Sequence, residues 1–184
     1  LAGRAEDLLE LLVARLGGRS VYPYQPKGLW MELNNRPGYS RAYQQGKGAD
    51  LYRRSIYTFW KRTVPSPMLK TFDAPEREFC TVRRSRTNTP LQALVLLNGP
   101  QYVEAARRLA ERMLTEGGRT LDERITYGFR LVTSRSPAAA ELAIFQDAWR
   151  AGLKRYSKDG AAALKLLKVG DSPYASGLDV KELA

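Results

Sequence analysis

Residues 89–116, TPLQALVLLNGPQYVEAARRLAERMLTE, decide the fold class because they contain two successive helix patterns with one break between them. Thr89 and Gln92 have the spacing of a capping box, and Pro90 stands at the first helical position. The leucine-rich run that follows is apolar on nearly every side, which predicts a buried helix over residues 91–97.

Helix patterns continue from this stretch to the end of the chain. Apolar residues recur every three or four positions, which indicates amphipathic helices, and turn residues such as Gly117-Gly118 separate them. A second capping box, Thr120 with Glu123, predicts a helix start. The predicted helices are 101–116 (Tyr102, Val103, Ala106, Leu109, Ala110, Met113), one from Leu121 (Ile125, Phe129, Val132), one from Ser136-Pro137 (Leu142, Phe145, Trp149, Leu153, Tyr156), 161–168, and a start in LDVKELA (178–184).

The N-terminal half has weaker signals. Leucines at helical spacing predict a helix over residues 5–16, within 1–18, which Gly17-Gly18 would end. Residues 19–88 contain many prolines, glycines and aromatic residues, which indicate an irregular, ordered arm. Within this arm, residues 51–64 fit a helix or a strand, and we favour a helix.

Together these patterns predict a mainly α fold: an irregular or orthogonal helical bundle with a loop-rich aromatic N-terminal arm and little or no β structure. We expect residues 1–184 to be a single domain fragment, with a helix in 1–18, the basic aromatic arm over 19–88 and the bundle over 89–184. No apolar run approaches the length of about 20 residues that spans a bilayer, so no membrane insertion is predicted.

The composition excludes several kinds of chemistry. The 184 residues include one cysteine and no histidine. An internal disulfide, a cysteine-rich metal site, a Ser-His-Asp triad and histidine-based acid–base catalysis are therefore excluded within this chain. We predict no catalytic residue, no metal site and no cofactor in it. Neighbouring carboxylates such as Asp122 and Glu123 are better explained as first-turn charges that favour a helix dipole.

The net charge of +11 is concentrated in the middle of the chain, where residues 51–90 hold nine Lys or Arg and three Asp or Glu. Arginine binds sulfate, phosphate or carboxylate in a bidentate manner, so this segment is the first candidate anion site. The alternative is that these side chains pair with Asp73, Glu76 and Glu78 or are solvated. The candidate anion-binding residues are Arg53, Arg54, Arg62, Arg83, Arg84 and Arg86.

Tyr22, Tyr24 and Trp30 in the arm are candidate contacts for sugar rings or bases. The alternative is that these rings pack the arm itself.

Cys80 lies near arginines that could lower the pKa of a thiol. Because Phe79 and Val82 flank it and no histidine is present, we interpret Cys80 as a buried, inert residue.

Three segments carry a family resemblance. The stretch YRRSIYTFWKRTVPSPMLKTFDAPEREFCTVRRSRTNTPLQALVLLNGPQYVEAARRLAERML (52–114) closely resembles the DUF1553 family, also called the planctomycete PSD1 domain. GGRSVYPYQPKGLW and GFRLVTSRSPAAAELAIF are similar to the same family in register. The resemblance covers roughly residues 17–184 and implies that the chain is the C-terminal part of that domain.

The resemblance implies a domain with no assigned activity, from large exported bacterial proteins that carry cytochrome c-like and DUF1549 modules, so we expect a periplasmic or secreted location. The first hypothesis is a non-catalytic scaffold or binding module, with anionic polysaccharide and the other modules of the parent protein as partners. The second is part of an enzyme whose active site an N-terminal half completes. The third, nucleic-acid binding through residues 51–90, is disfavoured because export would separate the protein from nucleic acid.

Overall fold

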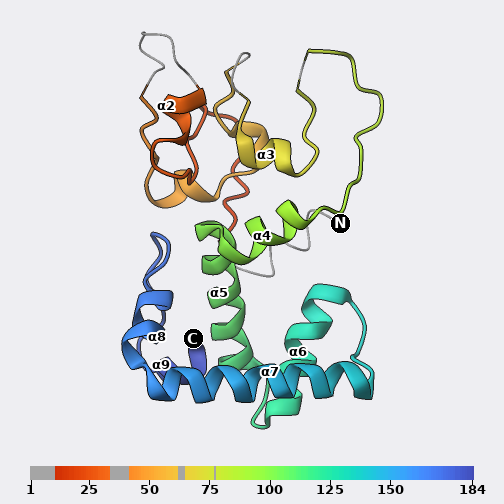
Figure 1. Cartoon of the computed structure of the whole chain (residues 1–184), viewed down its shortest axis with the longest axis vertical. Coiled ribbons are helices and arrows are strands. Elements are labelled where there is room, and N and C mark those ends of the chain that lie inside the picture. The colour runs from red at the N-terminus through yellow and green to blue at the C-terminus, as the bar shows by residue number, and fades with distance from the viewer. Residues whose placement is uncertain (1–10, 34–41, 62–64, 77) are drawn as a thin grey trace. The chain divides into compact units, whose positions relative to one another are not determined.

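A computed structural model describes residues 11–33, 42–61, 65–76 and 78–184. Over these residues the fold is mainly α, with no strand, which confirms the predicted fold class. Isolated β-bridges join Val13 to Arg53 and Val21 to Thr58. The elements (Figure 1) are α2 (Leu29–Leu33), η1 (Gly48–Tyr52), η2 (Ser55–Tyr57), α3 (Pro67–Thr71), α4 (Pro90–Asn98), α5 (Pro100–Glu116), α6 (Leu121–Thr133), α7 (Ala139–Lys158), α8 (Gly160–Leu167) and α9 (Val180–Leu183).

Contacts divide the described residues into two compact units, which we call the N-terminal unit (Leu12–Gly99) and the C-terminal unit (Pro100–Ala184, with Leu11). The division falls after α4, so contacts group this helix with the aromatic arm, while the predicted bounds of the arm (19–88) and the bundle (89–184) stay a prediction. That residues 1–184 form a single domain stays a prediction. None of the helices in the described ranges is both long and apolar enough to cross a membrane.

The C-terminal unit follows the predicted helix pattern. Helix α6 packs against both α5 and α7, and α8 and α9 pack against each other. The capping box at α6 is present, because the Thr120 hydroxyl accepts from the Glu123 N–H while the Glu123 carboxylate accepts from the Thr120 N–H. Gly128 lets α6 lie close to Met113 of α5, since a Cβ at this position would be only 2.6 Å from the Met113 sulfur.

The most buried side chains of α5 are charged, which the apolar pattern did not predict. Glu104, Arg107 and Glu111 are 0%, 5% and 6% exposed, whereas the apolar residues of this helix are more accessible. Arg107 donates to the carbonyl oxygens of Leu167 and Val169. Buried charges need such partners, and here the partners hold the segment after α8 against α5.

Aromatic rings form the centre of the N-terminal unit, in agreement with an ordered arm. The Tyr22 and Phe59 rings are stacked with centroids 4.7 Å apart, and the Trp30 ring lies 5.3 Å from that of Tyr43. Trp30 is 3% exposed. These rings therefore pack against one another and form a small core for a segment that has little regular structure.

Two predicted helices of the N-terminal half are wrong where the structure describes them. Residues 11–16 are not helical, and the Val13 N–H donates to the Tyr52 carbonyl at 2.9 Å; residues 1–10 lie outside the described residues. Residues 51–61 form 3-10 turns and bridges rather than an α-helix. In both segments, hydrogen bonds to distant parts of the chain take the place of hydrogen bonds within a helix.

Helix α4 has the predicted capping box but not the predicted burial. The box joins Thr89 and Gln92 in both directions. Leu91, Leu94 and Leu97 are nevertheless 57%, 57% and 74% exposed, and Gln92 is the buried residue. The prediction was wrong because the Gln92 amide donates to the Thr71 carbonyl at 2.9 Å, which turns the polar side of α4 toward α3 and the leucines outward.

Candidate functional site

A cavity of about 400 Å³ lies in the N-terminal unit, and we call it the aromatic pocket. It combines aromatic rings, side-chain amides and charged groups that come from separate parts of the arm. Its lining includes Arg19, Ser20, Tyr22, Trp30, Gln44, Gln45, Asp50 and Phe59.

Backbone hydrogen bonds between distant segments position this lining. The Phe59 N–H donates to the Val21 carbonyl at 2.8 Å, which places the Phe59 ring beside that of Tyr22. The Gly46 N–H donates to the Tyr22 carbonyl at 2.8 Å, which brings Gln44 and Gln45 to the rim. The pocket thus depends on the folded arm and not on any one helix.

The charged groups at the rim are only loosely paired. Asp50 lies 3.8 Å from an Arg15 nitrogen and 3.9 Å from an Arg19 nitrogen, and the Arg19 side chain is 90% exposed. Surface pairs of this kind contribute about 0–1 kcal/mol, so the arginines can exchange partners at little cost. Two cations facing one carboxylate leave this rim with an excess of positive charge.

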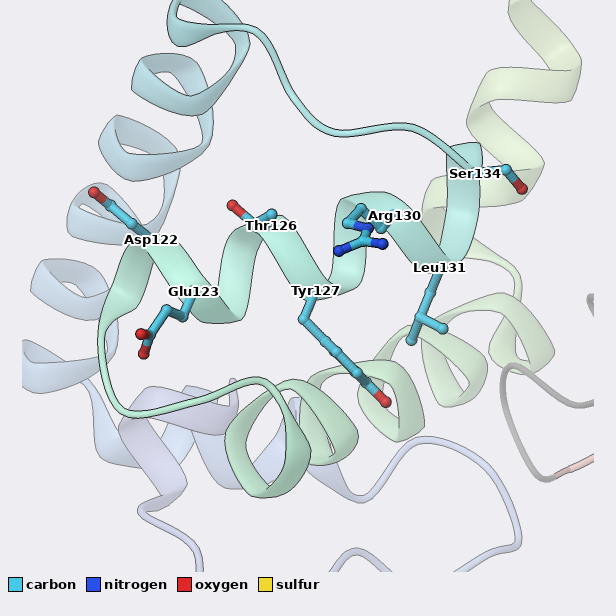
Figure 2. A pocket seen from close by; sticks show the side chains of 7 residues that line it. All are labelled: Asp122, Glu123, Thr126, Tyr127, Arg130, Leu131 and Ser134. Atoms are coloured by element: carbon cyan, nitrogen blue, oxygen red, sulfur yellow. The ribbon is translucent and has the colours of Figure 1, made fainter.

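A second, open cavity of about 720 Å³ lies along α6 (Figure 2). Its lining comes from α6 and from Ser134, the residue after it: Asp122, Glu123, Thr126, Tyr127, Arg130, Leu131 and Ser134. Figure 2 shows these side chains distributed along a single helix rather than converging on one point. Such an arrangement is typical of the outer face of an amphipathic helix.

The Glu123 and Tyr127 side chains in the α6 cavity already have hydrogen-bond partners. Backbone N–H groups of Thr120 and Arg119 donate to Glu123 and lower the pKa of its carboxyl. The Tyr127 hydroxyl donates to Glu116, and burial is the main cause that raises the Tyr127 pKa. Both pKa values are displaced away from neutrality, so these groups are poor proton donors or acceptors near pH 7.

The predicted arginines do not form one exposed cluster. Arg53 is 7% exposed; its Nη2 donates to the carbonyls of Arg15 and Gly17 at 2.6 and 2.7 Å, and its guanidinium lies 3.8 Å from the centre of the Tyr57 ring. These contacts are internal, so the Arg53 guanidinium is not presented to solvent.

Arg84 also makes contacts within its own unit. It donates to the carbonyls of Phe72 and Asp73 at 2.9 and 3.1 Å, just after α3. Arg54, Arg83 and Arg86 are exposed, while Arg62 lies outside the described residues. Anion binding by these arginines stays a prediction.

The predicted aromatic contacts divide in the same way. Tyr22 and Trp30 line the aromatic pocket, whereas Tyr24 is 7% exposed and its hydroxyl lies 3.4 Å from that of Tyr52, outside the lining.

Cys80 was predicted to be buried, and this was wrong: it is exposed. Its neighbours Phe79 and Val82 are exposed too, because the segment between α3 and α4 packs no side chain of this run inward.

Sequence reasoning missed Gln44, Gln45, Asp50 and Phe59 as pocket residues. Their spacing carries no motif, because long-range pairing of the arm brings them together.

Over the part of the chain that the structure describes, no three Cys, Asp or Glu side chains gather as a metal site would require. The absence of a cofactor stays a prediction.

The fold and the pocket define a basic, mainly α-helical protein with an aromatic cavity in its N-terminal unit. The family model PSD1, described as a protein of unknown function (DUF1553), matches residues 7–149. The chain therefore belongs to the PSD1 (DUF1553) family. No curated protein and no solved structure matches it.

Proposed function

We propose that this chain is a non-catalytic binding module whose aromatic pocket binds an anionic, sulfated polysaccharide. The observation that carries the proposal is the joint presence of Tyr22, Phe59, two glutamine amides and the Arg19 guanidinium in the lining of one cavity. Ligand sites of this kind combine an apolar floor with a few polar groups that orient the ligand.

Each type of side chain in the pocket matches one feature of such a ligand. The rings supply apolar surface for the C–H face of a sugar. The amides of Gln44 and Gln45 both donate and accept, as sugar hydroxyl groups require. The guanidinium groups of Arg15 and Arg19 offer paired donors for a sulfate, and a sulfate can replace their long contacts with Asp50.

The shifted pKa values of the described carboxyl and phenol groups offer no candidate for general acid–base catalysis among those groups. Wherever a pKa is shifted, it moves away from neutrality: the pKa values of Asp73, Glu116, Glu123 and Glu141 are lowered, and those of Tyr43, Tyr102 and Tyr127 are raised. General acid–base catalysis is favoured by a pKa near the working pH. The proposal also places the parent protein in the periplasm or outside the cell, with its other modules, as the family resemblance implies.

Calorimetric titration of the full chain with dextran sulfate, and with unsulfated dextran as the comparison, tests this function. Arg19→Ala and the double variant Gln44→Ala/Gln45→Ala should each weaken dextran sulfate binding about fivefold, which corresponds to about 1 kcal/mol. Arg119→Ala, which removes an exposed arginine of the C-terminal unit, is the matched control and should leave the affinity unchanged.

The salt dependence of the binding and two possible results test the proposal further. The affinity must fall with added salt, because solvent-exposed charges are screened. Absence of dextran sulfate binding would overturn the proposal. Equal weakening by Arg19→Ala and Arg119→Ala would also overturn it, because the polymer would then respond only to total charge.

A further inference from the structure

Helix α4 presents a row of apolar side chains that the N-terminal unit does not cover. Leu91, Leu94, Leu96 and Leu97 are 57%, 57%, 49% and 74% exposed. Exposed apolar surface of this kind on one helix marks an interaction site in folded proteins.

The exposure of these leucines is built into the unit. Gln92 donates from its amide to the Thr71 carbonyl and to the Thr87 hydroxyl, both at 2.9 Å. Thr87 in turn donates from its N–H to the Asp73 carboxylate at 2.8 Å. These hydrogen bonds attach one side of α4 to the end of α3, so the leucines on the other side are held outward in a defined orientation.

The segment before α4, residues 78–89, holds three arginines and one glutamate, and the Asp73 carboxylate contacts Thr87, which leaves a net positive charge before the apolar row. Arg83 and Arg86 are exposed in the segment before α4. Two residues lie between Arg86 and the cap Thr89, so their Cα atoms are at most about 11 Å apart. The positive end of the helix dipole lies at the same place. Helix α4 itself carries no acidic residue in its first turn. Charge complementarity therefore favours an acidic partner and disfavours a second copy of this basic surface.

The shape of the apolar surface favours a protein over a lipid partner. A helix that lies in a membrane interface has one apolar face and one strongly charged face. Helix α4 has leucines on several sides and no charged residue between Pro90 and Asn98. Leu91, Leu94 and Leu97 follow the spacing of three that a packed helix uses, and this matches recognition of one helix by another.

We propose that α4, together with Arg83 and Arg86, is a docking surface for an amphipathic helix of a partner protein. The apolar face of that helix would cover Leu91, Leu94 and Leu97. Its acidic side chains would face Arg83 and Arg86. This surface shares no residue with the lining of the aromatic pocket, so its test is independent of the polysaccharide proposal.

Fluorescence anisotropy with a designed peptide tests the proposal on the full chain. The probe is a labelled helix of about 18 residues with leucines on one face and glutamates elsewhere. A peptide of the same composition, scrambled so that its leucines share no face, is the comparison. The variants are Leu94→Ser/Leu97→Ser and Arg83→Ala/Arg86→Ala. Ile144→Ser and Arg119→Ala are the matched controls, because both remove exposed side chains of the C-terminal unit.

The amphipathic peptide should bind at least about tenfold more tightly than the scrambled one. The leucine variant should lose about tenfold in affinity, as expected for uncovering two leucines. The arginine variant should lose several-fold and show a smaller salt dependence. Both controls should bind as the unaltered chain does. Circular dichroism and the urea midpoint should show that each variant is folded, which is expected because every altered side chain is exposed.

Several results would overturn the proposal. One is equal binding of the two peptides, or no binding of either. Another is unchanged affinity of the leucine variant. Binding to phosphatidylserine vesicles without binding to the peptide would assign α4 to a membrane surface instead. A dimer in sedimentation that Leu94→Ser/Leu97→Ser abolishes, without peptide binding, would assign it to a second copy of the chain.

Discussion

Glu104 on α5 is completely buried, and its carboxylate accepts a hydrogen bond from the backbone N–H of Ser172 at 2.7 Å. Arg107, one turn further along, donates to the carbonyl of the same serine at 2.6 Å. Glu111 accepts from the N–H of Ala175 at 3.0 Å. Three charged residues of one helix thus satisfy the backbone of a segment without regular structure, which explains how residues 168–176 are held in place.

Replacement of Arg107 by methionine should destabilise the protein by about 3–5 kcal/mol, because it leaves the carboxylate of Glu104 buried without its cation. Glu111 keeps its ion pair with Arg108 at 2.8 Å. Chemical unfolding measures this change. Arg150→Ala is the matched control: it breaks the Arg150–Asp147 pair, whose side chains are 62% and 77% exposed, and should cost less than about 1 kcal/mol. An Arg107→Met variant as stable as this control would contradict a structural role for the network.

Alanine at Gly170 should destabilise the protein by about 2 kcal/mol or more. Gly170 has a φ of +94°, which side chains rarely adopt, and a Cβ there would lie 2.6 Å from both carboxylate oxygens of Glu104. Gly152, in the middle of α7, has no atom within 4 Å of an added Cβ. Gly152→Ala should therefore stabilise the helix by up to about 1 kcal/mol. Thermal unfolding of the two variants should shift in opposite directions, and a shift in the same direction would disagree with this geometry.

The carboxyl of Glu141 should make stability depend on pH in the acid range. Hydrogen bonds from the Arg135 guanidinium and the Ala138 N–H lower its pKa from 4.5 to about 2. A pKa that is lower in the folded state stabilises the protein above the unfolded value, and this contribution is lost as the pH falls from 4.5 toward 2. The effect of Glu141→Gln on the urea midpoint should therefore be largest near neutral pH and disappear in acid.

Nuclear magnetic resonance provides the direct readout for Glu141. The side-chain carboxyl carbon should titrate with a midpoint near 2 in the unaltered chain and closer to 4.5 in Arg135→Ala. A midpoint near 4.5 in the unaltered chain would show that the carboxylate does not make these hydrogen bonds in solution.

In α4, replacing a glutamine should lower the free energy of unfolding more than replacing a leucine, the reverse of what is usual for a helix with a buried apolar side. Gln92→Ala removes a buried amide that donates to Thr71 and Thr87, and should cost about 1–3 kcal/mol. Leu94→Ala changes a side chain that is 57% exposed and should cost less than about 1 kcal/mol. Urea unfolding of both variants measures the difference. A larger loss for Leu94→Ala would mean that this leucine is covered in solution.

Local features of this protein were predictable from the sequence because their partners lie within one helical turn. The capping boxes at Thr89 and Thr120 each join residues three positions apart, and both are present. The helices of the C-terminal unit follow for the same reason, since their apolar spacing recurs every three or four residues. The family was also readable, from the segment around α4 and α5.

Burial was less predictable, because an apolar pattern shows what a helix can bury but not what lies against it. In α4 the buried side chain is Gln92, since the carbonyl of Thr71 at the end of α3 and the hydroxyl of Thr87 accept hydrogen bonds from its amide. In α5 the buried side chains include Glu104 and Arg107, since a distant segment offers them backbone groups.

The candidate site, too, was only partly predictable from the sequence. From the sequence alone, the aromatic arm was predicted to be ordered, and Tyr22 and Trp30 were predicted as candidate contact residues. Only the tertiary structure decided that Gln44, Asp50 and Phe59 share a cavity with them, that Arg53 is buried, and that the exposed Arg84 donates to backbone carbonyls. The physical reason is that the sequence determines which groups can bond, whereas folding over long chain separations determines which partners they meet.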